Sequence, residues 1–63
     1  MSDLLVVRES GPSTLTVVDD DLGRDDAADV ADRARRDHPG QDVEVVSSGV
    51  LEMMALTGGY TVE

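Results

Sequence analysis

Residues 23–40 read GRDDAADVADRARRDHPG, and this stretch decides the fold. It carries a stripe of small apolar residues at helical spacing, which predicts one helix from Arg24 to about Asp37. The stripe consists of Ala27, Val30, Ala31 and Ala34. Gly23 can serve as the N-cap, and His38-Pro39-Gly40 ends the helix. Acidic side chains gather in the first turns and arginines in the last, which matches the helix dipole.

Two strands are expected before this helix. Leu4–Arg8 is rich in aliphatic and β-branched residues, and Thr14–Val18 alternates polar and apolar residues. The turn sequence Ser10–Ser13 lies between them, so we expect an antiparallel hairpin. Both faces of the first strand are apolar, which is typical of a central strand or of a strand that another subunit covers.

A third strand and a second helix are expected after it. Asp42–Val46 alternates polar and apolar residues and predicts a strand that crosses back onto the sheet. Val50–Leu56 predicts a short, strongly apolar helix with Ser48 as its N-cap, ending at Thr57-Gly58-Gly59. The tail Tyr60–Glu63 is either a fourth, edge strand or a disordered end.

This order of elements predicts a small α+β fold, a two-layer ββαβ sandwich with a short second C-terminal helix, in one domain over residues 1–63. A chain of 63 residues buries only about 60% of its unfolded surface, so its core needs support. Cysteine is absent and His38 is the single histidine, which removes disulfides and thiolate metal sites. Oligomerisation or docking onto a partner is the support that remains.

The charge balance is the strongest signal in the composition. Fourteen acidic residues stand against five arginines and no lysine, for a net charge of −9. The resulting self-repulsion opposes folding in dilute buffer, but molar salt shortens the Debye length to about 3 Å. The composition predicts a halophilic protein. The alternatives are an acidic protein of ordinary salinity or a disordered tail, and the periodic apolar blocks disfavour disorder.

Residue usage supports adaptation to salt. Ile, Asn, Lys and Phe are all absent, and Asp outnumbers Glu by ten to four. The absent residues share AT-rich codons, which a GC-rich gene avoids. In this respect the composition resembles that of haloarchaeal cytoplasmic proteins. No basic leader or run of roughly 20 apolar residues is visible, and an anionic surface is repelled by lipid and nucleic acid phosphates. We therefore expect a cytoplasmic protein with neither a membrane nor a nucleic acid as partner.

The apolar segment Val50–Tyr60 is the main functional signal. Both sides of its short helix are apolar, although closing a core needs only one. Methionine and tyrosine are also frequent at contact surfaces. The candidate interface residues are Leu5, Val7, Leu51, Met53, Met54 and Tyr60. The prediction is a non-catalytic homodimeric or partner-binding interaction module that uses this segment or the open sheet face; the alternative is that the segment only closes the core.

Two features invite a catalytic interpretation. Asp19–Asp21, Asp25 and Asp26 could supply oxygen ligands, but their spacing does not match a calcium loop, and a solvated helix entry is preferred. His38 has no nucleophilic cysteine or serine motif beside it. We assign no catalytic, cofactor-binding or metal residue, and a small enzyme or enzyme subunit using His38 and the Asp19–Asp26 carboxylates stays an alternative.

Gly58-Gly59 lies near the end of the sequence. With a hairpin and a helix before it, this pair resembles the diglycine of ubiquitin-like modifiers of the β-grasp fold. The resemblance implies a modifier or carrier. Active modifiers end at the diglycine, whereas here Tyr60–Glu63 follows, so this alternative requires processing after Gly59.

Overall fold

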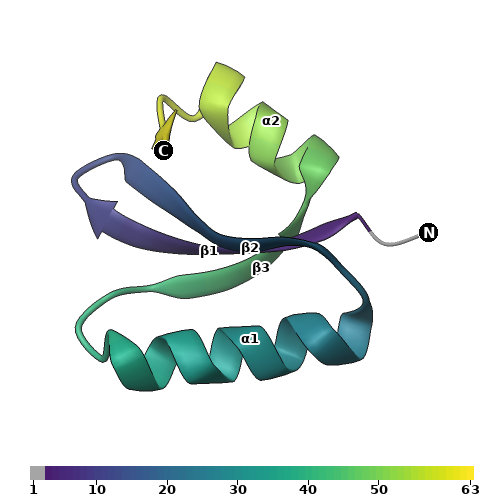
Figure 1. Ribbon diagram of the computed structural model, residues 1–63. Helices are drawn as coiled ribbons and strands as arrows, with labels where there is room; N and C mark the ends of the chain where they lie inside the picture. Colours follow the sequence, from purple (N-terminus) through teal and green to yellow (C-terminus); the bar gives the residue numbers. More distant parts are fainter. Residues whose placement is uncertain (1–2) are drawn as a thin grey trace.

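The computed structural model describes residues 3–63 as a ββαβαβ protein with one mixed sheet of four strands and two helices (Figure 1). The strand order in the sheet is β3-β1-β2-β4. The elements are β1 (Leu4–Gly11), β2 (Thr14–Leu22), α1 (Arg24–Asp37), β3 (Val43–Ser47), α2 (Ser48–Thr57) and β4 (Thr61–Val62). The predicted α+β class and the order of its elements are confirmed.

β1 and β2 form the expected antiparallel hairpin, with Val7 opposite Val17. β2 is longer than predicted, because it continues beyond Val18 to Leu22, which pairs with Leu4. The register shifts between Leu4 and Val6, and Asp21 takes a left-handed conformation with φ of 56°. The acidic run before α1 is therefore part of an irregular strand and not a helix entry.

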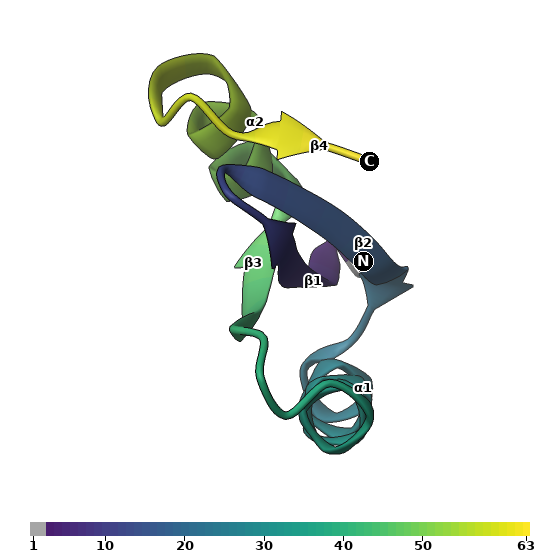
Figure 2. The ribbon, with the colours of Figure 1, turned by 90° about the vertical axis from the view of Figure 1, so that its left-hand side faces the viewer.

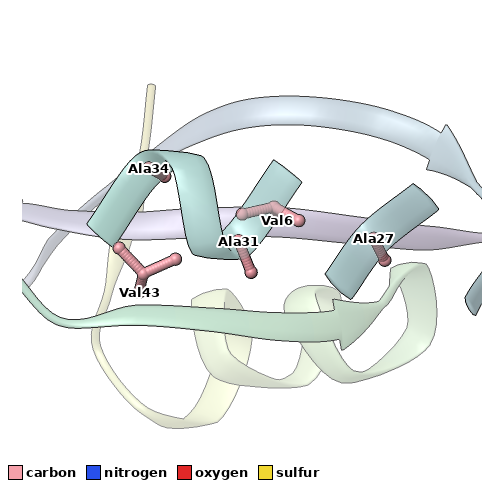
Figure 3. Close-up of a cluster of buried hydrophobic side chains, with 5 residues drawn as sticks. All are labelled: Val6, Ala27, Ala31, Ala34 and Val43. Atoms are coloured by element: carbon pink, nitrogen blue, oxygen red, sulfur yellow. The ribbon is translucent and has the colours of Figure 1, made fainter. Parts of the chain in front are cut away.

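α1 covers one face of the sheet and packs across β1, β2 and β3 (Figures 1 and 2). It begins after Gly23 and ends at His38, as the sequence predicts. Figure 3 shows its small side chains directed at the two valines of the sheet. This core cluster consists of Val6, Ala27, Ala31, Ala34 and Val43. Alanines bring the helix close to the strands, but each buries little apolar area, so the layer adds little hydrophobic stability.

α2 lies on the opposite side of the sheet from α1 and adds a partial third layer to the predicted sandwich (Figures 1 and 2). It contacts mainly β3, the strand that leads into it. Its N-cap is Ser47, whose Oγ accepts a hydrogen bond from the Val50 amide at 3.2 Å. The prediction of Ser48 as N-cap is wrong by one residue, because Ser47 is the last extended residue and Ser48 is already helical.

The tail forms a fourth strand, β4, at the edge of the sheet, which is one of the two conformations expected for it. It runs parallel to β2, with Thr61 beside Thr14 and Val62 beside Leu15. The Thr61 amide donates to the Ser13 carbonyl oxygen at 2.8 Å. Within residues 3–63, no helix is both long enough and apolar enough to cross a membrane.

Candidate functional site

The outer side of α2 presents three large apolar side chains to solvent. Val50, Met53 and Leu56 are 47%, 63% and 76% exposed. They stand three residues apart, so they share one broad side of the helix. We call this set the α2 ridge. No residue of α2 is buried, whereas globular proteins bury one side of a surface helix.

The inner side of α2 explains why the ridge points outward. Leu51 and Met54 are half-buried, and Met54 lines a small hollow together with Val7, Leu15 and Tyr60. Val7 and Leu15 are only 1% and 4% exposed. One side of α2 and the tyrosine after it thus cover the sheet, which leaves the ridge with nothing to pack against.

Hydrogen bonds at both ends define where α2 begins and ends. Ser47 caps its first turn, and the Gly58 amide donates to the Met54 carbonyl oxygen at 3.0 Å at its last turn. Thr57 Oγ1 also donates to the Met53 carbonyl oxygen, at 2.7 Å. All of these bonds are made by the backbone and by the end residues of α2, so none of them uses the apolar side chains of the ridge.

α2 carries much less charge than the rest of the molecule. Glu52 is the single charged residue among the ten of α2, in a chain with a net charge of −9. By contrast, nine of the fourteen residues of α1 are charged. The residues of α2 themselves therefore add little like-charge repulsion to a contact made through its outer side.

The predicted interface residues divide into three groups in the structure. Met53 is exposed on the ridge. Leu5, Leu51, Met54 and Tyr60 are half-buried, and Met54 and Tyr60 lie where α2 and its following turn meet the sheet. Val7 is only 1% exposed, beneath Met54 and Tyr60 in the wall of the small hollow, so a partner has little of it to contact. Val50 and Leu56 complete the ridge, and their spacing from Met53 is the signal in the sequence that could have identified them.

The sheet edges are less suited to pairing with another chain than the α2 ridge. β3 is a short edge strand, and Arg35 Nη2 donates to its Val43 carbonyl oxygen at 3.2 Å. β4 pairs with the first part of β2 beyond the turn. The last part of β2 carries Asp19–Asp21, and edge charges of this kind disfavour strand addition.

The acidic cluster does not form one site. Asp19 and His38 line a groove between β2 and α1, whereas Asp20 and Asp21 line a separate hollow with Leu5. Asp25 and Asp26 are exposed in the first turn of α1. Across residues 3–63, no three histidine or acidic side chains are arranged to hold a metal ion. The strand conformation of β2 separates side chains that sit side by side in the sequence.

The diglycine has a structural role at the end of α2. A Cβ on Gly58 would lie 2.8 Å from the Met54 carbonyl oxygen, which is too close for any other residue without a backbone shift. Gly59 has φ of 75°, in the left-handed region that favours glycine. Both glycines thus serve the turn that leads into β4.

The ridge is suited to burying apolar surface against another apolar surface. The two acid-lined hollows and the charged outer side of α1 carry carboxylates or arginines instead. The chain matches no protein-family model, and neither the search of curated proteins nor the search of solved structures found a match.

Proposed function

We propose that this chain is a small, salt-adapted, non-catalytic interaction module that self-associates as a dimer through the α2 ridge. The observation that carries this proposal is the exposure of Val50, Met53 and Leu56 on a helix with a single charge. Exposed apolar surface of this kind marks contact sites in soluble proteins.

A second copy of the chain is the partner that the apolar character of the ridge favours. In a two-fold dimer the same patch faces itself, so the ridge meets an equally apolar surface. α2 is about 15 Å long, which makes a contact of modest area. A dimer of this size is expected to have micromolar affinity, unless Leu51 and Tyr60 extend the contact.

The thin core gives the dimer a role in stability. Val6 and Val7 are the largest side chains with less than 2% exposure, and the rest of the α1 layer is mostly alanine. A chain of 63 residues with such a core has little stability to spare. Burying the ridge would add apolar area without changing the monomer fold, at roughly 25 cal/mol per Å².

Salt adaptation follows from the net charge of −9. Two copies bring their charges together on association, and this repulsion weakens as the Debye length falls from about 10 Å at 0.1 M salt to about 3 Å at 1 M. We therefore propose that the dimer forms in molar KCl and that the salt-rich cytoplasm is its place of action.

The test is sedimentation of the wild type, Leu56→Gln and Val45→Thr in molar KCl. Leu56 is 76% exposed on the ridge, whereas Val45 is 40% exposed on β3, away from the ridge. Each dimer contains two copies of Leu56, so Leu56→Gln should raise the dimer dissociation constant by about 100-fold.

Val45→Thr keeps a β-branched side chain and removes apolar surface elsewhere, so it should leave the dissociation constant unchanged. Equal effects of the two substitutions would refute an interface on the ridge. A folded wild-type monomer at high protein concentration would refute self-association altogether.

A further inference from the structure

A groove on the α1 side of the sheet is separate from the α2 ridge. It runs between β2 and α1 and has a volume of about 410 Å³, within the range of small-molecule sites. Apolar side chains from both elements form part of its wall, with Arg8, Arg33 and His38 beside them. The apolar members are Val17, Val18, Val30 and Ala34. Because α1 and α2 lie on opposite sides of the sheet, the groove stays open when the ridge is covered (Figure 1).

Arg8 is the residue in this groove that is best suited to bind an anionic ligand. It is half-buried on the central strand β1, where a charge is normally paired. Its Nη1 donates to the Gln41 side-chain oxygen at 2.7 Å, which orients the guanidinium. Within residues 3–63, the ion pair in the structure joins Arg36 to Asp32, and no carboxylate lies within 4.0 Å of Arg8. A guanidinium has five N–H donors, so most donors of Arg8 are open to an anion.

The local charge of the groove differs from that of the whole molecule. Arg8 and Arg33 balance Asp19 and Asp37, which also line the groove, while the chain carries a net charge of −9. The other two hollows are lined by carboxylates with no cation among their lining residues. An anion therefore finds its least unfavourable potential in the groove.

We propose that this groove binds a small organic carboxylate with a short apolar chain. The carboxylate would accept hydrogen bonds from the Arg8 guanidinium, whose planar fork matches it, while the chain lies against Val18 and Val30. Val18 is 40% exposed and Val30 half-buried, so both have apolar surface left to cover. Recognition has two parts, one charged and one apolar, and an anion without an apolar chain satisfies only the first.

The test is titration with hexanoate in molar KCl, followed by amide NMR. Acetate and hexanol are the comparison probes, because each keeps one of the two parts of hexanoate. We expect hexanoate to shift the amides of β2 and of the second half of α1, and to bind more tightly than either comparison probe. Equal or tighter binding of hexanol, equal binding of acetate, or no shift with hexanoate would overturn the proposal.

Arg8→Gln and Arg24→Gln form the matched pair of variants. Arg24 is exposed at the start of α1 and does not line the groove. Removing a charge-assisted hydrogen bond should weaken hexanoate binding by about 10-fold or more in Arg8→Gln. Arg24→Gln makes the same change in net charge, so it should alter binding by less than about twofold in molar salt. Equal weakening of hexanoate binding in both variants would contradict a role for Arg8. If Arg8→Gln does not fold, Arg33→Gln takes its place in the comparison with Arg24→Gln, because Arg33 is an exposed arginine that also lines the groove.

Discussion

The two helices of this protein differ in charge and in how much of their surface the fold buries. α1 is highly charged and amphipathic, and it buries Ala27, Ala31 and Ala34 to 1%, 1% and 4% exposure. α2 is almost uncharged, buries no residue and leaves Leu56 76% exposed. Solvent already satisfies the outer side of α1, because that side is polar. The outer side of α2 is apolar, so it gains stability only from another surface. The face that we propose for binding is thus the one that a single chain leaves unpacked.

The largest effect is expected beneath α1. Ala31 is 1% exposed in the core, while Ala28 of the same helix is exposed. Ala31→Leu must push the helix away from the sheet and should lower the free energy of unfolding by about 1–3 kcal/mol. Ala28→Leu should change it by less than about 0.5 kcal/mol. Denaturant unfolding of both variants in molar KCl measures the difference, and an Ala31→Leu protein as stable as Ala28→Leu would show that α1 is not closely packed.

A smaller effect is expected at the helix starts. Ser47 caps α2 through its side chain, whereas Gly23 at the start of α1 makes no side-chain cap bond. Ser47→Ala should lower the free energy of unfolding by about 1 kcal/mol, and Gly23→Ser should raise it by a few tenths of a kcal/mol at most. Thermal unfolding of the two variants checks both signs. If Ser47→Ala had no effect, α2 would not depend on its cap.

The smallest effect is expected on the solvent side of α1. Arg36 Nη2 and Asp32 Oδ2 are 2.7 Å apart, but their side chains are 77% and 59% exposed. Arg36→Gln should therefore change the free energy of unfolding by less than about 0.5 kcal/mol, and by less still in molar KCl. Unfolding curves at two salt concentrations provide the measurement. A loss above about 1 kcal/mol in molar KCl would contradict this expectation, because it exceeds what an exposed ion pair contributes.

The sequence predicted the elements whose signals are local. The alanine stripe and His38-Pro39-Gly40 define α1 to the residue, because both helical spacing and helix ends are encoded by neighbours. The hairpin followed for the same reason. β2 was predicted too short, since Asp19–Asp21 has low strand propensity and only its pairing with β1 keeps it extended.

The site was less predictable than the fold. Because α2 is apolar on both sides, its sequence does not say which side faces the sheet. The burial of Val7 depends on Met54 and Tyr60, which come more than forty residues later in the chain. The groove at Arg8 is likewise formed by residues of β1, β2 and α1, so no local sequence pattern predicts it. Contacts between segments that are distant in the sequence determine which of these residues are exposed.

The most direct test of the central claim is the native mass of the wild-type protein by light scattering, across protein concentrations, in molar KCl and again at low salt. We expect a folded dimer in KCl that dissociates on dilution and loses its fold when screening is removed, because repulsion from the net charge of −9 then returns. A folded monomer at every concentration in KCl would contradict it, since the α2 ridge would then remain exposed without a second copy.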